Sequence, residues 1–199
     1  MTTTTHSVQQ QHILRIKKSL SEEKCKSLIS LFKKDEFKSK IKKGPKNNYC
    51  IQNKIHFYEY MQLNPSAAPF SKELIAGLKE YANQNPFLQT RQWGLVNECR
   101  LKRFFPGKSY FTEHCEHGSG KVDSLIILAW MFYLNSIPSN NGGGTRFPQQ
   151  GHTSPAVEGD LLIWPAFWTH SHYGEVAMVN EKYIISGWCR YKEEELMTQ

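Results

Sequence analysis

The sequence has no apolar run long enough to cross a membrane. Its longest run, 125–134, is about half of the roughly 20 residues that a transmembrane helix needs. The segment 1–12 has neither the basic start nor the apolar centre of a secretory signal. We therefore expect a cytoplasmic protein without a membrane partner.

The cysteines lack the spacing of a zinc knuckle or of a disulfide framework. The chain has 5 cysteines, an odd number, and no two of them form a CxxC pair. This pattern argues against structural zinc and against stabilising disulfides, so we expect reduced thiols. The residues concerned are Cys25, Cys50, Cys99, Cys115 and Cys189.

Acidic residues are in deficit, with 18 Asp and Glu against 25 Lys and Arg and a formal net charge of +7. Much of the excess lies in the first quarter of the chain, as in Lys33, Lys34 and the stretch 38–46. Such a patch can attract nucleic acid, but aromatic residues are not regularly interleaved with the basic ones. A solvated basic face is the favoured interpretation, and we do not expect nucleic acid as a partner.

The length of 199 residues suits one compact domain with one active site. No internal repeat is visible, and the Thr- and Gln-rich segment 1–11 is predicted to be a flexible tail. A single domain is then expected over 12–199. We divide it into a helical support of about 19–91 and a strand-rich core of about 92–192.

Two helices are predicted in the supporting part. Ser19 and Glu22 have the spacing of a capping box ahead of the apolar stripe in 28–32, which predicts a helix of about 14 residues. Apolar residues recur at helical spacing again over 71–84. The mostly polar segment 38–54 between the two helices is predicted to be a loop.

Short runs of β-branched and aromatic residues, separated by Gly, Pro and Asn, follow Gln92 and are typical of strands in a sandwich or barrel. Helices first and strands afterwards predict an α+β fold in which N-terminal helices buttress a jelly-roll. Six strands are expected, near 93–105, 110–115, 124–135, 160–164, 169–173 and 182–191.

Four of the 8 histidines fall in two short segments, EHCEHG and WTHSHYG. Alternate side chains of a strand share a face, so His114 and Glu116 would project together and could bind one metal ion. A histidine of the second segment, His170 or His172, would complete a set of two imidazoles and one carboxylate. This donor set is the facial triad of Fe(II) oxygenases.

A facial triad leaves three coordination positions of the metal open. A bidentate 2-oxo acid can take two of them and dioxygen the third, which a zinc site closed by four protein ligands does not allow. The HxE spacing is weak by itself, because two nearby histidines and a glutamate are more often surface polar residues. Other motifs must therefore support this interpretation.

Several further motifs follow one another between positions 105 and 188: PGKSYFTEHCE, YLN, GGGTRFP, GDLLIWP and KYIISGW. On these motifs, roughly the C-terminal half of the chain resembles the prolyl 4-hydroxylase-like branch of the 2-oxoglutarate/Fe(II) oxygenases, including forms found in phages and bacteria. The segment LSEEKCKSLISLF is similar to the helix that opens many of these domains.

The resemblance implies a double-stranded β-helix and hydroxylation of a C–H bond, with Fe(II), 2-oxoglutarate and dioxygen as cofactors and ascorbate as a candidate reductant. It implies a prolyl residue in a peptide or protein as the substrate, with free proline or another small amino acid as the alternative. We expect a monomer, in the host cytoplasm if a phage encodes it. Two competing hypotheses are a non-catalytic jelly-roll binding protein and a nucleic-acid demethylase, the latter supported only by the basic N-terminal half.

The resemblance also selects His172 over His170 as the distal ligand. The family places a basic residue ten positions beyond that histidine, and here this residue is Lys182. Lys182 would pair with the far carboxylate of 2-oxoglutarate, which would be costly to bury alone. Tyr110 shares the strand parity of His114 and could donate a hydrogen bond to the cosubstrate, with core packing as an equal alternative.

The chain departs from the family pattern at two positions. Glu116 stands where the family more often has Asp, which lengthens the ligand arm by one methylene. Gly144 replaces the acidic residue of the family's GGET segment. Three aromatic residues of the strand-rich half are predicted to pack in the core rather than to take part in chemistry: Tyr133, Trp164 and Trp188.

Overall fold

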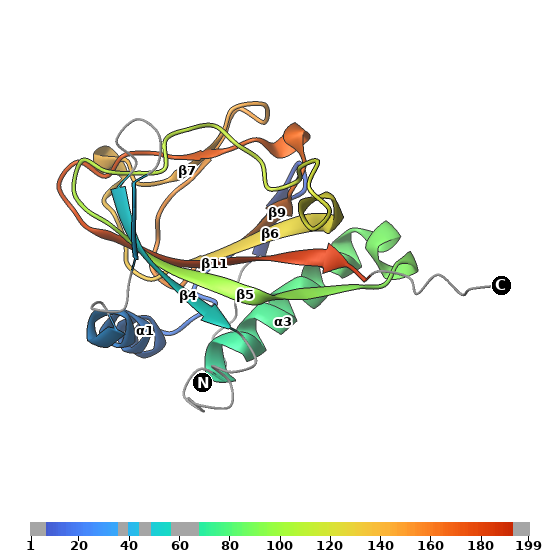
Figure 1. Ribbon diagram of the computed structural model, residues 1–199, viewed down its shortest axis with the longest axis horizontal. Coiled ribbons are helices and arrows are strands. Elements are labelled where there is room, and N and C mark those ends of the chain that lie inside the picture. The colour runs from blue at the N-terminus through green and yellow to red at the C-terminus, as the bar shows by residue number, and fades with distance from the viewer. Residues whose placement is uncertain (1–6, 36–39, 44–48, 57–67, 193–199) are drawn as a thin grey trace.

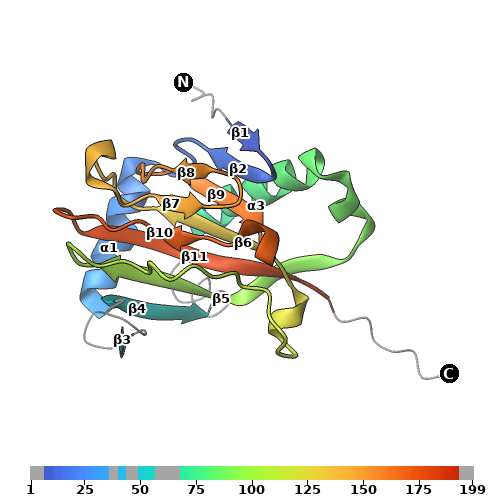
Figure 2. The ribbon, with the colours of Figure 1, turned by 90° about the horizontal axis from the view of Figure 1, so that it is seen from above.

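In a computed structural model the described part of the chain forms two facing β-sheets, with two helices beneath the larger sheet (Figure 1, Figure 2). The helices are α1 (Glu22–Asp35) and α3 (Ala68–Gln84). The larger sheet has 8 strands and the smaller has 3. The structure describes residues 7–35, 40–43, 49–56 and 68–192.

All strand pairs are antiparallel, in the order β1-β2-β9-β6-β11-β5-β4-β3 in the larger sheet and β10-β7-β8 in the smaller. The strands are β1 (Ser7–Gln10), β2 (Ile13–Ile16), β3 (Lys40–Lys43), β4 (Tyr49–His56), β5 (Trp93–Phe104), β6 (Ile126–Tyr133), β7 (Thr145–Phe147), β8 (His152–Ser154), β9 (Leu161–Pro165), β10 (Tyr173–Gly174) and β11 (Lys182–Tyr191). Short 3-10 helices are η3 (Pro86–Thr90), η4 (Asp123–Leu125), η5 (Ser139–Asn141) and η6 (Trp168–His170).

One edge of the larger sheet is extended by the β1–β2 hairpin, which pairs with β9 through Leu14 and Ile163. The segment 1–11 was predicted to be a tail, but residues 7–10 form β1, and residues 1–6 lie outside the described part. The hairpin covers the free edge of β9, whose backbone N–H and C=O groups need partners.

The other edge is extended by β3 and β4, which pair beside β5. The prediction of a loop over 38–54 is therefore wrong for residues 40–43 and 49–54, and residues 44–48 lie outside the described part. Polar, lysine-rich strands are common at sheet edges because they discourage pairing with other molecules. The apolar residues of β3 and β4 alternate only weakly with polar ones, so the sequence pattern did not reveal these two strands.

Helix α1 has 14 residues, as predicted, but a different residue caps it. The helix begins at Glu22, and the backbone N–H of Lys24 donates to Oγ of Ser21 at 3.4 Å. Ser19 therefore does not cap the helix, because it lies two residues before the position from which a side chain reaches the first turn. Along α1 the residues that face the sheet are Cys25, Leu28 and Phe32.

Helix α3 begins three residues before the predicted start and ends at Gln84, as predicted. Its buried residues are Phe70, Leu74, Leu78 and Tyr81, at the spacing of one helical face. A Cβ built on Gly77 would overlap Leu161 of β9, so the helix lies close against the sheet at this point. Within the described residues, no helix is both long enough and apolar enough to span a bilayer.

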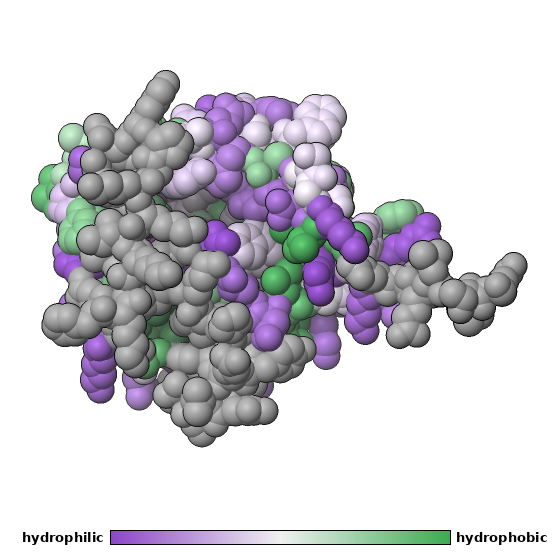
Figure 3. Space-filling view, viewed as in Figure 1, coloured by the Kyte–Doolittle hydropathy of each residue, from purple (hydrophilic) through white to green (hydrophobic). Residues whose placement is uncertain are grey.

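Two apolar clusters occupy the two sides of the larger sheet. One lies between the sheet and the helices and includes Phe32, Leu74, Trp130 and Ile185. The other lies between the two sheets, and its members include Phe104, Met131, Tyr133, Phe147, Trp164 and Ile184. The described surface on the face drawn in Figure 3 is mostly hydrophilic, with smaller hydrophobic patches.

Two predicted strands are replaced by irregular segments that still meet. Residues 110–115 form no regular strand, and 169–173 begin with η6. They are joined by an isolated antiparallel bridge between His114 and His172. These two segments lie alongside the smaller sheet and bring motifs from distant parts of the sequence together.

Gly187 of β11 provides a test of the packing between the larger sheet and its helices. A Cβ at this position would lie 2.5 Å from Cζ2 of the buried Trp130, a rigid ring that cannot move aside. We expect Gly187→Ala to lower the free energy of unfolding by about 1–3 kcal/mol, measured by urea denaturation. Gly94→Ala in β5 is the matched control, because no atom lies within 4 Å of its added Cβ; equal effects of the two changes would contradict this packing.

Candidate metal centre

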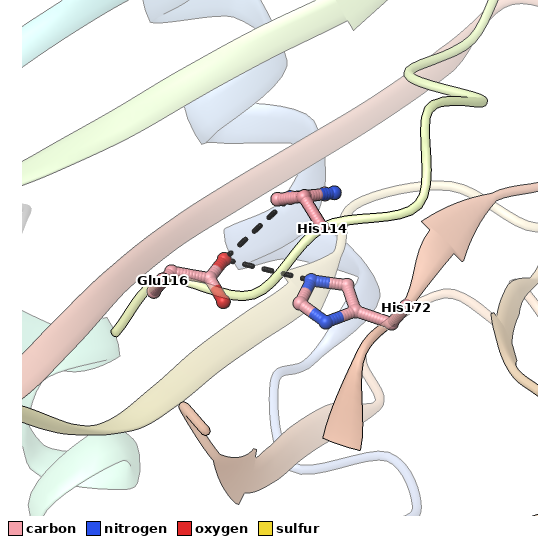
Figure 4. A group of neighbouring side chains, drawn as sticks. All are labelled: His114, Glu116 and His172. Carbon is pink, nitrogen blue, oxygen red and sulfur yellow. Dashed lines mark ion pairs between the residues drawn. The ribbon is translucent and has the colours of Figure 1, made fainter. Parts of the chain in front are cut away.

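Three side chains converge between the two sheets (Figure 4). Oε1 of Glu116 lies 3.8 Å from Nε2 of His114 and 3.5 Å from Nε2 of His172. One ligand atom from each residue lies within 4.8 Å of the other two. The structure thus brings together the three residues that the sequence predicted as metal ligands.

Backbone hydrogen bonds hold these three residues in place. The N–H of His114 donates to the carbonyl of His172 at 3.0 Å, and the N–H of His172 donates back at 2.8 Å. The N–H of Glu116 donates to the carbonyl of Ala166, just beyond β9, at 3.1 Å. The positions of the ligand atoms therefore depend on contacts between segments that are far apart in the chain.

Each imidazole is oriented by a backbone carbonyl. Nδ1 of His114 lies 3.0 Å from the carbonyl oxygen of Thr112, and Nδ1 of His172 lies 3.1 Å from that of His170. A carbonyl oxygen can only accept, so Nδ1 carries the proton in both rings. In the neutral rings the lone pair is then on Nε2, the atom nearer to Glu116.

The protonation of the site suits cation binding. Burial, followed by the neighbouring His172, lowers the pKa of His114. Burial alone would raise the pKa of Glu116, but its hydrogen bond and charge interaction with His172, together with His114, hold this pKa below its ordinary value. At neutral pH the site therefore offers an ionised carboxylate and a neutral His114 ring.

Glu116 also has an unsatisfied oxygen. Its Oε2 is buried and has no hydrogen-bond partner among the described residues. A buried polar atom of this kind is costly unless a cation or a donor compensates it. With two imidazole nitrogens and one carboxylate, the donor set fits a divalent ion such as Fe(II).

His170, the alternative ligand, lies outside this cluster. Its Nε2 lies 2.9 Å from the carbonyl oxygen of Gln11, and its Nδ1 lies 3.0 Å from Oγ1 of Thr169. The turn of η6 directs its ring toward the β1–β2 hairpin and away from Glu116. Alternation along a regular strand would have placed His170 and His172 on one face, and the 3-10 turn is the reason why they separate.

Lys182 begins β11 and is buried between the sheets. Its Nζ donates to the carbonyl of Gly143 at 3.0 Å and lies 5.0 Å from the ring centroid of Phe104. Burial is the main cause that lowers its pKa to about 8. No carboxylate in the described part of the chain forms an ion pair with it, so an incoming carboxylate would stabilise the buried ammonium.

Tyr110 lies at the rim of the cluster. Its ring packs edge-on against His114, with the two ring centroids 4.4 Å apart, and its side chain is exposed. Its carbonyl accepts a hydrogen bond from the N–H of Gly174 at 2.8 Å. The tyrosine is therefore not a core residue. Core packing was the alternative role considered from the sequence.

Sequence reasoning missed two contributions to this region. Trp164, predicted only to pack, lies edge-on against His172 with ring centroids 4.9 Å apart, and its buried Nε1 has no partner among the described residues. Lys102 of β5 faces the same space as the cluster, because Phe104 on the same strand parity packs between the sheets. The alternation of side chains along β5, which puts Lys102 on the same face as Phe104, was the signal that could have shown that Lys102 faces this space.

No family model and no curated protein matches the chain. Solved structures do match. A collagen prolyl hydroxylase of Paramecium bursaria chlorella virus-1, solved with 2-oxoglutarate, is 17% identical with a TM-score of 0.67, covering 92% of this chain and 97% of that one. A Pseudomonas putida prolyl 4-hydroxylase is 17% identical with a TM-score of 0.68, covering 91% and 93%.

A third match is a prolyl hydroxylase of Trichoplax adhaerens in complex with a peptide fragment of the hypoxia inducible factor oxygen degradation domain. It is 14% identical with a TM-score of 0.70, and the match covers 94% of this chain and 87% of that one. At these identities the matches show the fold. The predicted α+β fold, a double-stranded β-helix buttressed by N-terminal helices, is confirmed.

The contacts of His170 predict an indirect effect on the metal centre. Its ring anchors η6 to the hairpin at Gln11, and its carbonyl orients the ring of His172. Because changes to groups around a ligand weaken metal binding by about 10- to 100-fold, we expect His170→Ala to raise the dissociation constant for a divalent metal about tenfold. Titration with Co²⁺, followed by its absorption spectrum, measures both affinity and ligand geometry.

His170→Gln is the conservative control, since its amide can still donate to the Gln11 carbonyl, and we expect it to restore most of the affinity. An unchanged Co²⁺ affinity and spectrum in His170→Ala would show that this anchor has no influence on His172.

Proposed function

We propose that this chain is an Fe(II)- and 2-oxoglutarate-dependent dioxygenase that hydroxylates a prolyl residue in a peptide or protein. The observation that carries the proposal is the convergence of His114, Glu116 and His172 around one point, with the buried ammonium of Lys182 in the same space between the sheets. Three protein ligands leave coordination positions for a cosubstrate, and a buried cation suits a dicarboxylate.

Each residue has a defined role in this proposal. His114, Glu116 and His172 would hold Fe(II), which, with 2-oxoglutarate and dioxygen, supplies the oxidising power for a C–H bond while the oxo acid is converted to succinate and carbon dioxide. Lys182 would bind the far carboxylate of 2-oxoglutarate. Tyr110, packed against His114 at the rim, would donate its hydroxyl hydrogen bond to the cosubstrate.

The surroundings of His172 support this assignment. Trp164 and Phe147 pack against its ring, with centroids 4.9 Å and 5.6 Å away, and exclude water from that side of the metal centre. A site closed on one side and open toward Tyr110 would expose the metal to a substrate from one direction. The peptide bound to the Trichoplax enzyme supports a peptide substrate for a protein of this fold.

The substrate is tested directly by incubating proline-containing peptides and free proline with the protein, Fe(II), 2-oxoglutarate and ascorbate in air. Mass spectrometry should detect the gain of one oxygen atom in a peptide, together with succinate. Oxygen gain in free proline alone would favour the small-molecule alternative. Absence of both products would favour a jelly-roll protein that binds without catalysis.

Loss of a metal ligand should abolish activity without unfolding the domain. Because changes around a ligand already weaken metal sites by about 10- to 100-fold, His172→Ala or Glu116→Gln should raise the Fe(II) dissociation constant at least about 100-fold. Anaerobic Fe(II) titration and succinate quantification measure the two effects, and circular dichroism checks the fold. Lys79→Gln, an exposed change on α3, is the control, and succinate formation by His172→Ala would refute the ligand assignment.

Lys182 makes 2-oxoglutarate binding sensitive to pH. Below about pH 8 its ammonium is charged and can pair with a carboxylate; as the pH rises through its pKa of about 8, the charge is lost. The dissociation constant of 2-oxoglutarate should therefore rise by up to about tenfold per pH unit above this value. Calorimetric titrations between about pH 7 and about 9.5 measure the effect.

Lys182→Arg is the matched control for the pH series, because a guanidinium stays charged over the whole range. Its affinity for 2-oxoglutarate should be flat where that of the unsubstituted protein declines. If both proteins show the same profile, the charge of Lys182 is not what binds the dicarboxylate.

A further inference from the structure

The length of the Glu116 side chain sets how far its backbone must lie from the other two ligands. In Figure 4 its carboxylate reaches toward both His114 and His172. A glutamate carboxylate lies one methylene further from its own backbone than an aspartate carboxylate, a difference of about 1.5 Å along the side chain. Distances between a metal ion and its protein ligands keep within about 0.2 Å of their usual values. A backbone held in place for one of these two residues therefore does not suit the other.

The backbone at Glu116 is held by a single carbonyl group. The N–H groups of Glu116 and His117 both donate to the carbonyl of Ala166, at 3.1 Å and 3.0 Å. The N–H of Ala166 in turn donates to the carbonyl of Ile127 in β6, an inner strand of the larger sheet, at 2.9 Å. The segment that carries the carboxylate is thus tied to the sheet through Ala166, and a shift of about 1.5 Å would break these hydrogen bonds.

The side chain of His117 provides a second anchor for the same segment. Its Nδ1 lies 3.1 Å from the carbonyl oxygen of Ile126, at the start of β6, and because a carbonyl only accepts, Nδ1 carries the proton and donates. Its ring packs against Phe167, with the ring centroids 4.4 Å apart and the planes tilted by 33°. The half-buried residue directly after Glu116 is therefore fixed on two sides.

The packing of His117 on Phe167 also joins the two segments that carry the ligands. Phe167 directly precedes η6, and its carbonyl accepts a hydrogen bond from the N–H of His170 at 2.9 Å. The turn that begins in this way leads to His172, while His117 follows Glu116. His117 therefore connects the position of the carboxylate with that of the distal imidazole, in addition to the isolated bridge between the two ligand histidines.

We propose that His117 is a positioning residue that, together with the Ala166 carbonyl, holds the backbone at the distance that suits glutamate and not aspartate at position 116. The inference rests on the metal site of the proposed function and deepens it. His117 acts through Glu116, so this role requires no contact with the metal ion, the cosubstrate or the substrate. The expected effects are on metal affinity and on the geometry of the ligands.

The reach of the carboxylate is tested with Glu116→Asp. Both residues offer a carboxylate, so the change alters reach and leaves the type of ligand the same. We expect the dissociation constant for Co²⁺ to rise about tenfold or more. The absorption spectrum of bound Co²⁺ should also change, because its bands depend on ligand geometry. Equal affinity and an equal spectrum for the two carboxylates would overturn the proposal.

The anchor itself is tested with two changes at His117. His117→Ala removes both contacts of the ring, and we expect it to raise the Co²⁺ dissociation constant about tenfold, as changes to groups around a ligand do. His117→Asn keeps a side-chain N–H at the place of Nδ1, so it should recover most of the affinity and the original spectrum. Lys121→Gln, an exposed change in the loop between His117 and β6, is the control and should leave both unchanged. Unchanged affinity in His117→Ala, or no recovery in His117→Asn, would contradict the positioning role.

The double variant, Glu116→Asp with His117→Ala, separates positioning from a general loss of stability. Released from Ile126 and Phe167, the backbone can advance and let the shorter side chain reach the ion. His117→Ala should therefore weaken Co²⁺ binding at least about threefold less in the Glu116→Asp background than in the unsubstituted protein. Urea denaturation without metal shows that each variant is folded. If the two changes multiply independently, His117 has no influence on the reach of the carboxylate and the proposal is overturned.

Co²⁺ titrations need no turnover, so the proposed function is tested separately, by succinate formation with Fe(II) and 2-oxoglutarate in air. The expected coupling between the two positions without succinate would retain the positioning role and refute the enzyme. Succinate without the coupling would do the reverse. Absence of Co²⁺ binding by the unsubstituted protein would overturn both the ligand assignment and the positioning role that depends on it.

Discussion

The candidate metal centre depends on one pair of backbone hydrogen bonds, those that His114 and His172 exchange at 3.0 Å and 2.8 Å. Neither residue lies in a long strand, so this isolated bridge is what sets the separation of their rings. The Ala166 carbonyl then fixes Glu116 relative to both. Three ligand atoms come within reach of one ion because the strands behind them are already paired in the two sheets.

The space between the two sheets is apolar over much of its wall, and this makes its few charges effective. Glu116 and Lys182 are taken out of water, where unmatched charges are unstable and opposite charges attract strongly. The same burial lowers the pKa of Lys182 to about 8. A metal ion and a dicarboxylate would satisfy both residues at once, which connects the packing of the jelly-roll to the chemistry proposed for it.

Much of the fold was predictable, and the errors have identifiable causes. β11 has the predicted bounds, because it is rich in β-branched and aromatic residues, and β5 ends one residue before its predicted end. β3 and β4 were not predicted, because edge strands need not bury a face and so lack apolar alternation. The cap of α1 is Ser21 rather than Ser19, since both serines precede the apolar stripe and only the chain path distinguishes them.

By itself the sequence predicted a candidate donor set, two histidines and a glutamate, and the regular strands that carry Lys182 and the sheet core. The family resemblance, which places a basic residue ten positions beyond the distal histidine, favoured His172 over His170. Only the tertiary structure separated their rings, because a 3-10 turn breaks the alternation that sequence parity assumes. The place of Lys102 beside the triad was likewise decided by the register between β5 and β11. Such contacts join residues that are distant in the chain, and local sequence patterns do not show which distant residues meet.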